Sequence, residues 1–173
     1  VVHHGQKHHA ETIAITDKLL KTDPANWRAL RLRGDAYLSL GNQPAAIKDY
    51  DAALKVEPKE PGLLNNLAWV LATSPDDKLR DAKRARELAE LACEATQYKL
   101  PHILSTLGAA YAEAGDFDGA KKWLLKALEL AADDDAQKDH LRKELASYEK
   151  REPWRELQSP DDDKPVDEKK PAD

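Results

Sequence analysis

An internal repeat restricts the fold of this sequence more than any other feature. Residues 30–58 read LRLRGDAYLSLGNQPAAIKDYDAALKVEP, and residues 104–132 read LSTLGAAYAEAGDFDGAKKWLLKALELAA. Seven positions coincide at a constant offset of 74 residues: Gly34/Gly108, Ala36/Ala110, Tyr37/Tyr111, Gly41/Gly115, Ala46/Ala120, Ala53/Ala127 and Leu54/Leu128. Chance does not readily place seven small or aromatic residues in one register, so the chain contains copies of one structural unit.

The pattern within each unit predicts two helices joined by a turn. Over residues 45–56 the apolar positions are those of an amphipathic helix: Ala46, Ile47, Tyr50, Ala53 and Leu54. Gly41 and Gly115 stand where the first helix would end in a left-handed residue. Asn42 and Asp116 follow them as N-caps of the second helix.

These residues resemble the tetratricopeptide repeat, a helix-turn-helix unit of 34 residues. The Gly-x-Ala-Tyr motif, the turn glycine and the alanines of the second helix all match it. Two such periods fall short of 74 residues, which implies a longer middle repeat with its excess in TSPDDKLRD. The sequence NNLAWVLATSPD, followed by YAEAGDFDGA, also resembles arrays in large planctomycete-type bacterial proteins.

The resemblance implies an all-α, right-handed solenoid of about eight helices with no sheet. Residues 1–24 form a polar N-terminus and a half repeat, whose single helix covers about residues 10–22. Residues 25–132 form three repeats (27–60, 61–100 and 101–134 in register). Residues 135–151 form a capping helix with one apolar face and a solvated polar face. Residues 152–173, rich in acidic residues, Pro and Lys, form a tail that is disordered alone, except that Trp154 is expected to pack back on the cap.

Composition argues against several classes of function. The net charge of -5 disfavours a nucleic-acid surface, and no stretch reaches the roughly 20 apolar residues of a membrane span. The chain has a single cysteine, Cys93, which excludes an internal disulfide. We expect its side chain to be buried in the core. No phosphate loop or GxSxG motif occurs, so we expect no enzyme and no cofactor. The compartment stays open between the cytoplasm and an extracytoplasmic location.

A concave groove is the strongest candidate site. In this family the first helix of each repeat lines the groove, and the resemblance places these residues in it: Arg28, Arg31, Leu32, Asp35, Leu38, Asn65, Asn66, Trp69, Thr73, His102, Ser105, Thr106, Ala109 and Glu113. Asparagine can hydrogen-bond a peptide backbone, and tryptophan can anchor an apolar side chain. The alternative is a solvated groove without a dedicated ligand.

Two more specific sites are disfavoured. One branch of the family grips a C-terminal carboxylate; Arg31 and Asn66 match it, but Asp35, His102 and Thr106 replace its other residues. His4 and His8 are spaced to share a helix face and are weak metal candidates. A frayed polar terminus is the simpler interpretation of that cluster.

The favoured function is therefore a protein-binding module that holds a partner segment in its groove, as an adaptor does. One alternative is a scaffold that self-assembles as a homo-oligomer through an open apolar edge at Ile13, Leu19 and Leu20. Another is an accessory domain of a larger enzyme, prompted by the half repeat and by a start at Val1 without Met.

Overall fold

A computed structural model describes residues 2–131 and 135–156, with the backbone alone at residues 2–6 and 135. This part of the chain contains eight α-helices and one short 3-10 helix, and no strand. The elements are α1 Val2–Thr22, α2 Trp27–Ser39, α3 Gln43–Val56, α4 Pro61–Thr73, η1 Asp77–Leu79, α5 Ala82–Ala95, α6 Pro101–Glu113, α7 Phe117–Leu130 and α8 Asp135–Glu149. The expectation of an all-α helical solenoid is confirmed.

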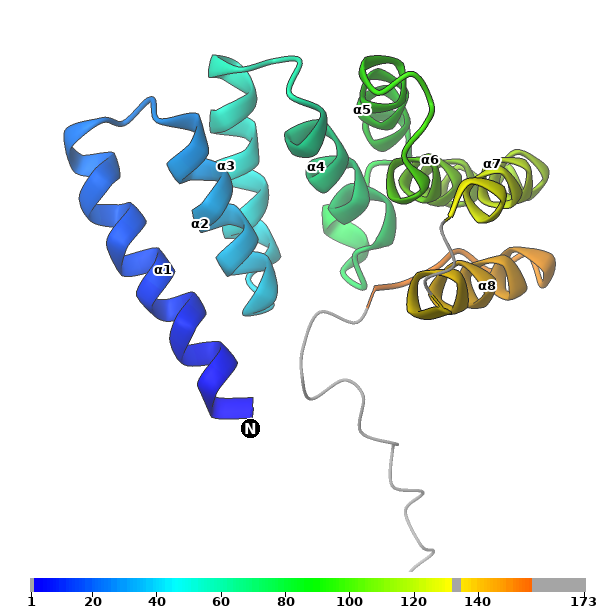
Figure 1. Ribbon diagram of the computed structural model, residues 1–173, viewed down its shortest axis with the longest axis horizontal. Helices are drawn as coiled ribbons and strands as arrows, with labels where there is room; N and C mark the ends of the chain where they lie inside the picture. The colour runs from blue at the N-terminus through cyan, green and yellow to red at the C-terminus, as the bar shows by residue number, and fades with distance from the viewer. Residues whose placement is uncertain (1, 132–134, 157–173) are drawn as a thin grey trace, which may run out of the picture.

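The helices form a curved row from α1 at one end to α7 and α8 at the other (Figure 1). Helices α2 and α3, α4 and α5, and α6 and α7 pack most extensively as pairs. Each pair also packs against the next, through α3 with α4 and α5 with α6. Neighbour-to-neighbour packing of this kind is the architecture of a solenoid.

The turns within the first and third pairs follow the sequence prediction. Gly41 and Gly115 adopt φ values of 76° and 83°, a left-handed conformation that glycine enters without a Cβ clash. The side chains of Asn42 and Asp116 accept hydrogen bonds from the backbone N–H groups of Ala45 and Gly119. Each turn therefore ends one helix and caps the next within a few residues.

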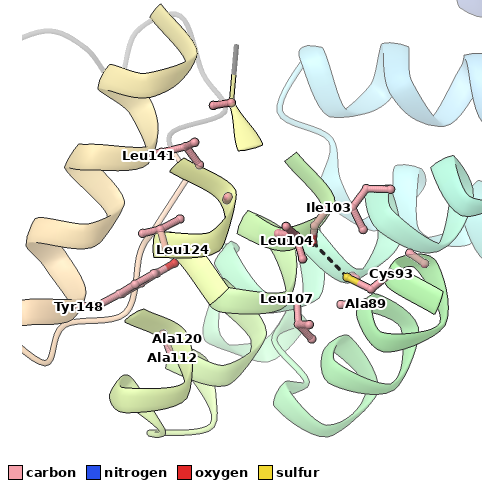
Figure 2. Packing of buried hydrophobic residues seen from close by; sticks show 14 of the residues in the cluster. Ala89, Cys93, Ile103, Leu104, Leu107, Ala112, Ala120, Leu124, Leu141 and Tyr148 are labelled. Carbon is pink, nitrogen blue, oxygen red and sulfur yellow. Dashed lines mark hydrogen bonds between the residues drawn. The ribbon is translucent and has the colours of Figure 1, made fainter. Parts of the chain in front are cut away.

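The apolar core consists of two adjoining clusters along the solenoid axis. In the cluster of Figure 2, Ile103, Leu104 and Leu107 of α6 lie between alanines of α5 and Leu124 of α7. Cys93 is fully buried there, and burial raises the pKa of its thiol to about 12. The thiol packs as a small apolar group rather than serving as a nucleophile.

The middle repeat carries its extra residues between α4 and α5, as expected. The 3-10 helix η1 occupies this insertion, capped by the side chain of Asp76. The backbone N–H of Asp81 donates back to the carbonyl of Leu71 in α4 (3.0 Å). The insertion also positions Arg80, which donates to Glu113 of α6 (2.9 Å) and to the carbonyl of Ser74 (2.8 Å).

The N-terminal end differs from the prediction in two respects. Helix α1 begins at Val2, about eight residues before the expected start and within the stretch interpreted as a frayed terminus. Leu20 is not part of an open edge: it is 9% exposed and packs in the core, and Ile13 is partly buried. Among apolar side chains of α1, Leu19 and Ile15 remain exposed, at 44% and 67%.

The C-terminal end also needs correction. The face of α8 expected to be solvated includes Glu144, which is fully buried beside Leu141 and Tyr148. Trp154 packs back on α8 as expected, against His140. Its neighbours, predicted to belong to a disordered tail, also lie on the helices: the N–H of Glu156 donates to the carbonyl of Thr73 (3.0 Å). The remainder of the predicted tail, 157–173, lies outside the described residues.

Candidate functional site

A cavity of about 410 Å³ opens on the concave side between α4, α6 and α8. Its lining comprises Leu38, Asn65, Asn66, Trp69, His102, Ser105, Thr106, Gln137, His140 and Leu141. Seven of the fourteen residues predicted for the groove thus meet in one place, since first helices present the same face at each repeat. Leu38, Trp69 and Leu141 give the cavity an apolar part, and amide, hydroxyl and imidazole groups surround it.

Two neighbouring asparagines play different roles in the wall. Asn66 donates through Nδ2 to Asp35 Oδ1 (2.9 Å), which also accepts the hydroxyl of Tyr50 (2.6 Å). Tyr50 is fully buried, and this burial raises the pKa of its hydroxyl, with the Asp35 contact adding to the effect. Asn66 therefore belongs to a network that ties α4 to α2 and α3.

Asn65 presents an acceptor that nothing satisfies within the described part of the chain. Its Nδ2 donates weakly to Asn66 Oδ1 (3.4 Å), whereas its Oδ1 is buried without a hydrogen-bond partner. A buried acceptor without a donor costs about 1–3 kcal/mol.

Helix α8 contributes the imidazole of His140 to the cavity lining. His140 Nε2 lies 3.1 Å from Glu144 Oε1, and the Ser105 hydroxyl donates to the same buried carboxylate (2.9 Å). The contact with Glu144 raises the pKa of His140 against the opposing effect of burial. His102 on the opposite side has a lowered pKa because of burial. Of the two imidazoles, His140 is thus the one favoured as a cation.

The other predicted groove residues lie away from the cavity. Arg28 stacks over the Trp27 ring (4.4 Å to the centroid), and Arg31 pairs with Glu60 (3.4 Å) and, more loosely, with Asp35 (3.9 Å). The remaining positions vary in exposure: Leu32 is exposed, while Thr73 and Ala109 are buried. Glu113 sits at the far end of the groove, between Arg80 and Arg155.

Sequence reasoning missed the contribution of α8, which supplies Gln137, His140 and Leu141 to the lining. A signal for it existed, because His140 stands 34 residues after Thr106, one period of the repeat. If the repeat register is continued into residues 135–151, His140 takes the position that Thr106 has in the third repeat.

Two segments match family models of the kind the fold suggests. Residues 34–73 match a model described as TPR repeat, and residues 101–134 match one described as tetratricopeptide repeat. With the paired helices, these matches support a tetratricopeptide repeat protein. Such repeats generally mediate protein–protein interactions, and proteins built from them are typically non-enzymatic modules. Neither match bears on the narrower planctomycete-type resemblance. No curated protein matches the chain.

Two further findings concern the described residues. No group of three or more His, Cys, Asp or Glu side chains there is placed to hold a metal ion. Of the weak metal candidates, His8 lies 3.6 Å from Glu11, and the side chain of His4 is outside the description. None of the described helices is long and apolar enough to cross a membrane.

Proposed function

We propose that the concave groove binds an extended segment of a partner protein, with an apolar side chain seated in the cavity beside Trp69. The single observation that carries this proposal is the combination found there: an apolar surface next to the buried, unpartnered Oδ1 of Asn65. An extended peptide offers both an apolar side chain and a backbone N–H within a few ångströms of each other. Binding would thus satisfy the acceptor and remove apolar area from water.

Trp69 is the anchor in this proposal. It is partly buried against the core, and its ring lies 6.4 Å from that of His140. A ring supported from behind loses little conformational freedom on binding, which is why tryptophan often dominates binding energy. Asn65 would act as the backbone acceptor, whereas Asn66 is already committed to Asp35.

The test begins with selection of linear peptides from a displayed random library against the intact chain. The affinity of a selected peptide is then measured by fluorescence anisotropy for the unaltered chain, for Trp69→Ala and for Asn65→Ala. We expect Trp69→Ala to weaken binding at least tenfold and Asn65→Ala several-fold, with helicity by circular dichroism unchanged. Trp123→Ala is the matched control, because Trp123 stacks on Tyr98 at the α7 surface outside the cavity.

Peptides that bind all four chains equally would show that they dock elsewhere and would contradict the proposal. Failure to select any peptide from the library would count against it as well. Asn66→Ala is a poor test, because it would disturb the Asp35–Tyr50 contact inside the fold.

A further inference from the structure

The segment after α8 is already an extended occupant of the concave face. We call residues 152–156 the strap. It leaves α8 through Arg151, whose φ of 60° reverses the chain, and it runs back along α8 towards α4 (orange in Figure 1). It forms neither helix nor strand, and the side chains from Pro153 to Glu156 are all partly exposed.

The strap completes the C-terminal end of α4. The last carbonyls of a helix have no partner within the helix. In α4 the carbonyl of Ala72 accepts Arg155 Nη1 (3.3 Å), and the carbonyl of Thr73 accepts the backbone N–H of Glu156 (3.0 Å). The strap thus supplies one backbone donor, which any extended segment has, and one side-chain donor, which requires an arginine.

The guanidinium of Arg155 contacts two kinds of oxygen: a carboxylate oxygen of Glu113 and the carbonyl of Ala72. Its Nη2 forms an ion pair with Glu113 Oε2 (2.7 Å), while the other oxygen of Glu113 accepts from Arg80 (2.9 Å). Glu113 is 14% exposed, so the pair is only partly screened by water. A planar guanidinium satisfies a carboxylate and a carbonyl together, which the single ammonium of lysine does less well.

Trp154 lies next to the proposed binding cavity. Its ring meets that of His140 edge-on, with centroids 5.5 Å apart, and its Nε1 donates to Glu156 (3.0 Å). His140 lines the cavity, so the strap and a peptide bound beside Trp69 would be neighbours.

We propose that this end of the groove is a recognition site for an extended segment in which an aromatic residue precedes an arginine, and that the strap is its intramolecular occupant. A partner segment of that chemistry exchanges with the strap. This inference rests on the proposed function, since it names the class of partner for the same groove. The tethered strap competes at an effective concentration in the millimolar range, so the unaltered chain should bind such a partner weakly.

The test uses the full chain and a probe copied from the strap. The probe is a fluorescein-labelled peptide KREPWRE, with the sequence of residues 150–156. In the receptor, Trp154→Ala combined with Arg155→Ala removes the side-chain contacts of the strap; we call this variant the disarmed chain. We expect anisotropy to show binding at least tenfold tighter to the disarmed chain than to the unaltered chain, because the competitor is gone.

Specificity is tested by substitutions in the probe and in the receptor chain. A probe with alanine in place of the arginine that corresponds to Arg155 should bind the disarmed chain at least tenfold more weakly. Adding Glu113→Gln to that chain should produce a similar loss. Glu87→Gln is the matched control, since Glu87 is exposed on α5 and pairs with Lys83, which is also exposed. If the double change lowers helicity, Arg155→Ala alone serves as the disarmed receptor.

Equal affinity of the probe for the unaltered and disarmed chains would overturn the inference. Equal affinity of the probe with and without the arginine that corresponds to Arg155 would also overturn it. No variant in this experiment alters Trp69 or Asn65. A negative result here, with library peptides still dependent on Trp69, would therefore reject the partner class and leave the proposed function standing. Library peptides that ignore Trp69 would instead remove the proposed function.

Discussion

At the scale of residues, adjacent side chains of one type serve different purposes according to their partners. Asn66 is held by Asp35, whereas Asn65 lines the cavity with a buried Oδ1 that has no hydrogen-bond partner among the described residues. Gly34 is similar: it fits the repeat pattern, but its environment explains it, since a Cβ there would lie 2.7 Å from the ring of buried Tyr50. Residue type alone does not distinguish the residue proposed to bind a partner from the one that stabilises the fold.

His140 gives the clearest prediction at this scale. Glu144 raises its pKa on folding above the ordinary value of 6.5. The resulting stabilisation is fully present below 6.5 and is lost as pH rises through the folded pKa. The free energy of unfolding of the unaltered chain should therefore exceed that of His140→Gln by more at about pH 5.5 than at about pH 8.5. Urea unfolding at both pH values measures the difference.

We expect this change to stay below about 1 kcal/mol, because solvent screens an exposed pair and the side chain of His140 is 45% exposed. His102 has the opposite dependence on pH, but it is present in both chains and cancels from the comparison. A difference that does not vary with pH, or that grows as pH rises, would contradict the assigned role of Glu144.

At the scale of elements, the two ends of the solenoid are attached in different ways. Helix α8 is fixed through the buried Glu144 and its contact with Ser105. Helix α1 packs on α2 through Leu20, and Arg33 bridges α1 to α3 by contacts with Asp17 (2.6 Å) and Asp49 (2.7 Å). Because a solenoid helix contacts only its neighbours, a defect in one end should remain local.

Leu20→Ala tests that expectation. Removing a buried leucine side chain costs about 2–5 kcal/mol, here at the contact between α1 and α2. We predict that amide hydrogen exchange measured by mass spectrometry accelerates in α1 while α6 and α7 keep their protection. Leu19→Ala is the matched control, because Leu19 is 44% exposed and should change little. Uniform acceleration along the chain would instead indicate a single cooperative unit.

At the scale of the whole molecule, the question is whether the chain self-assembles through the exposed surface of α1. Ile15 and Leu19 are the large apolar side chains left exposed on α1. Scattered apolar side chains on a surface are ordinary and need no partner. The covered Leu20 therefore weakens the case for a scaffold that joins copies end to end.

We predict a solution mass near 19.3 kDa by light scattering across a concentration series, for both the unaltered chain and Leu19→Asp. A mass that rises with concentration, and that Leu19→Asp returns to one chain, would restore the self-assembling scaffold as the better hypothesis.

The sequence by itself determined the repeated helix pairs, since their boundaries depend on local chemistry: Gly41 and Gly115 at the turns, Asn42 and Asp116 as caps, and alanines where helices approach closely. It also brought half of the candidate groove residues to one cavity, because the period of the repeat places them on the same face. Only the tertiary structure decided which of these residues are available. Three contacts decide it: Ser105 with Glu144, Asp35 with Asn66, and Glu113 with Arg155. The two residues of each contact are 31–42 positions apart in the sequence. The partner of a side chain across such a separation depends on how helices pack, and the local pattern does not specify it.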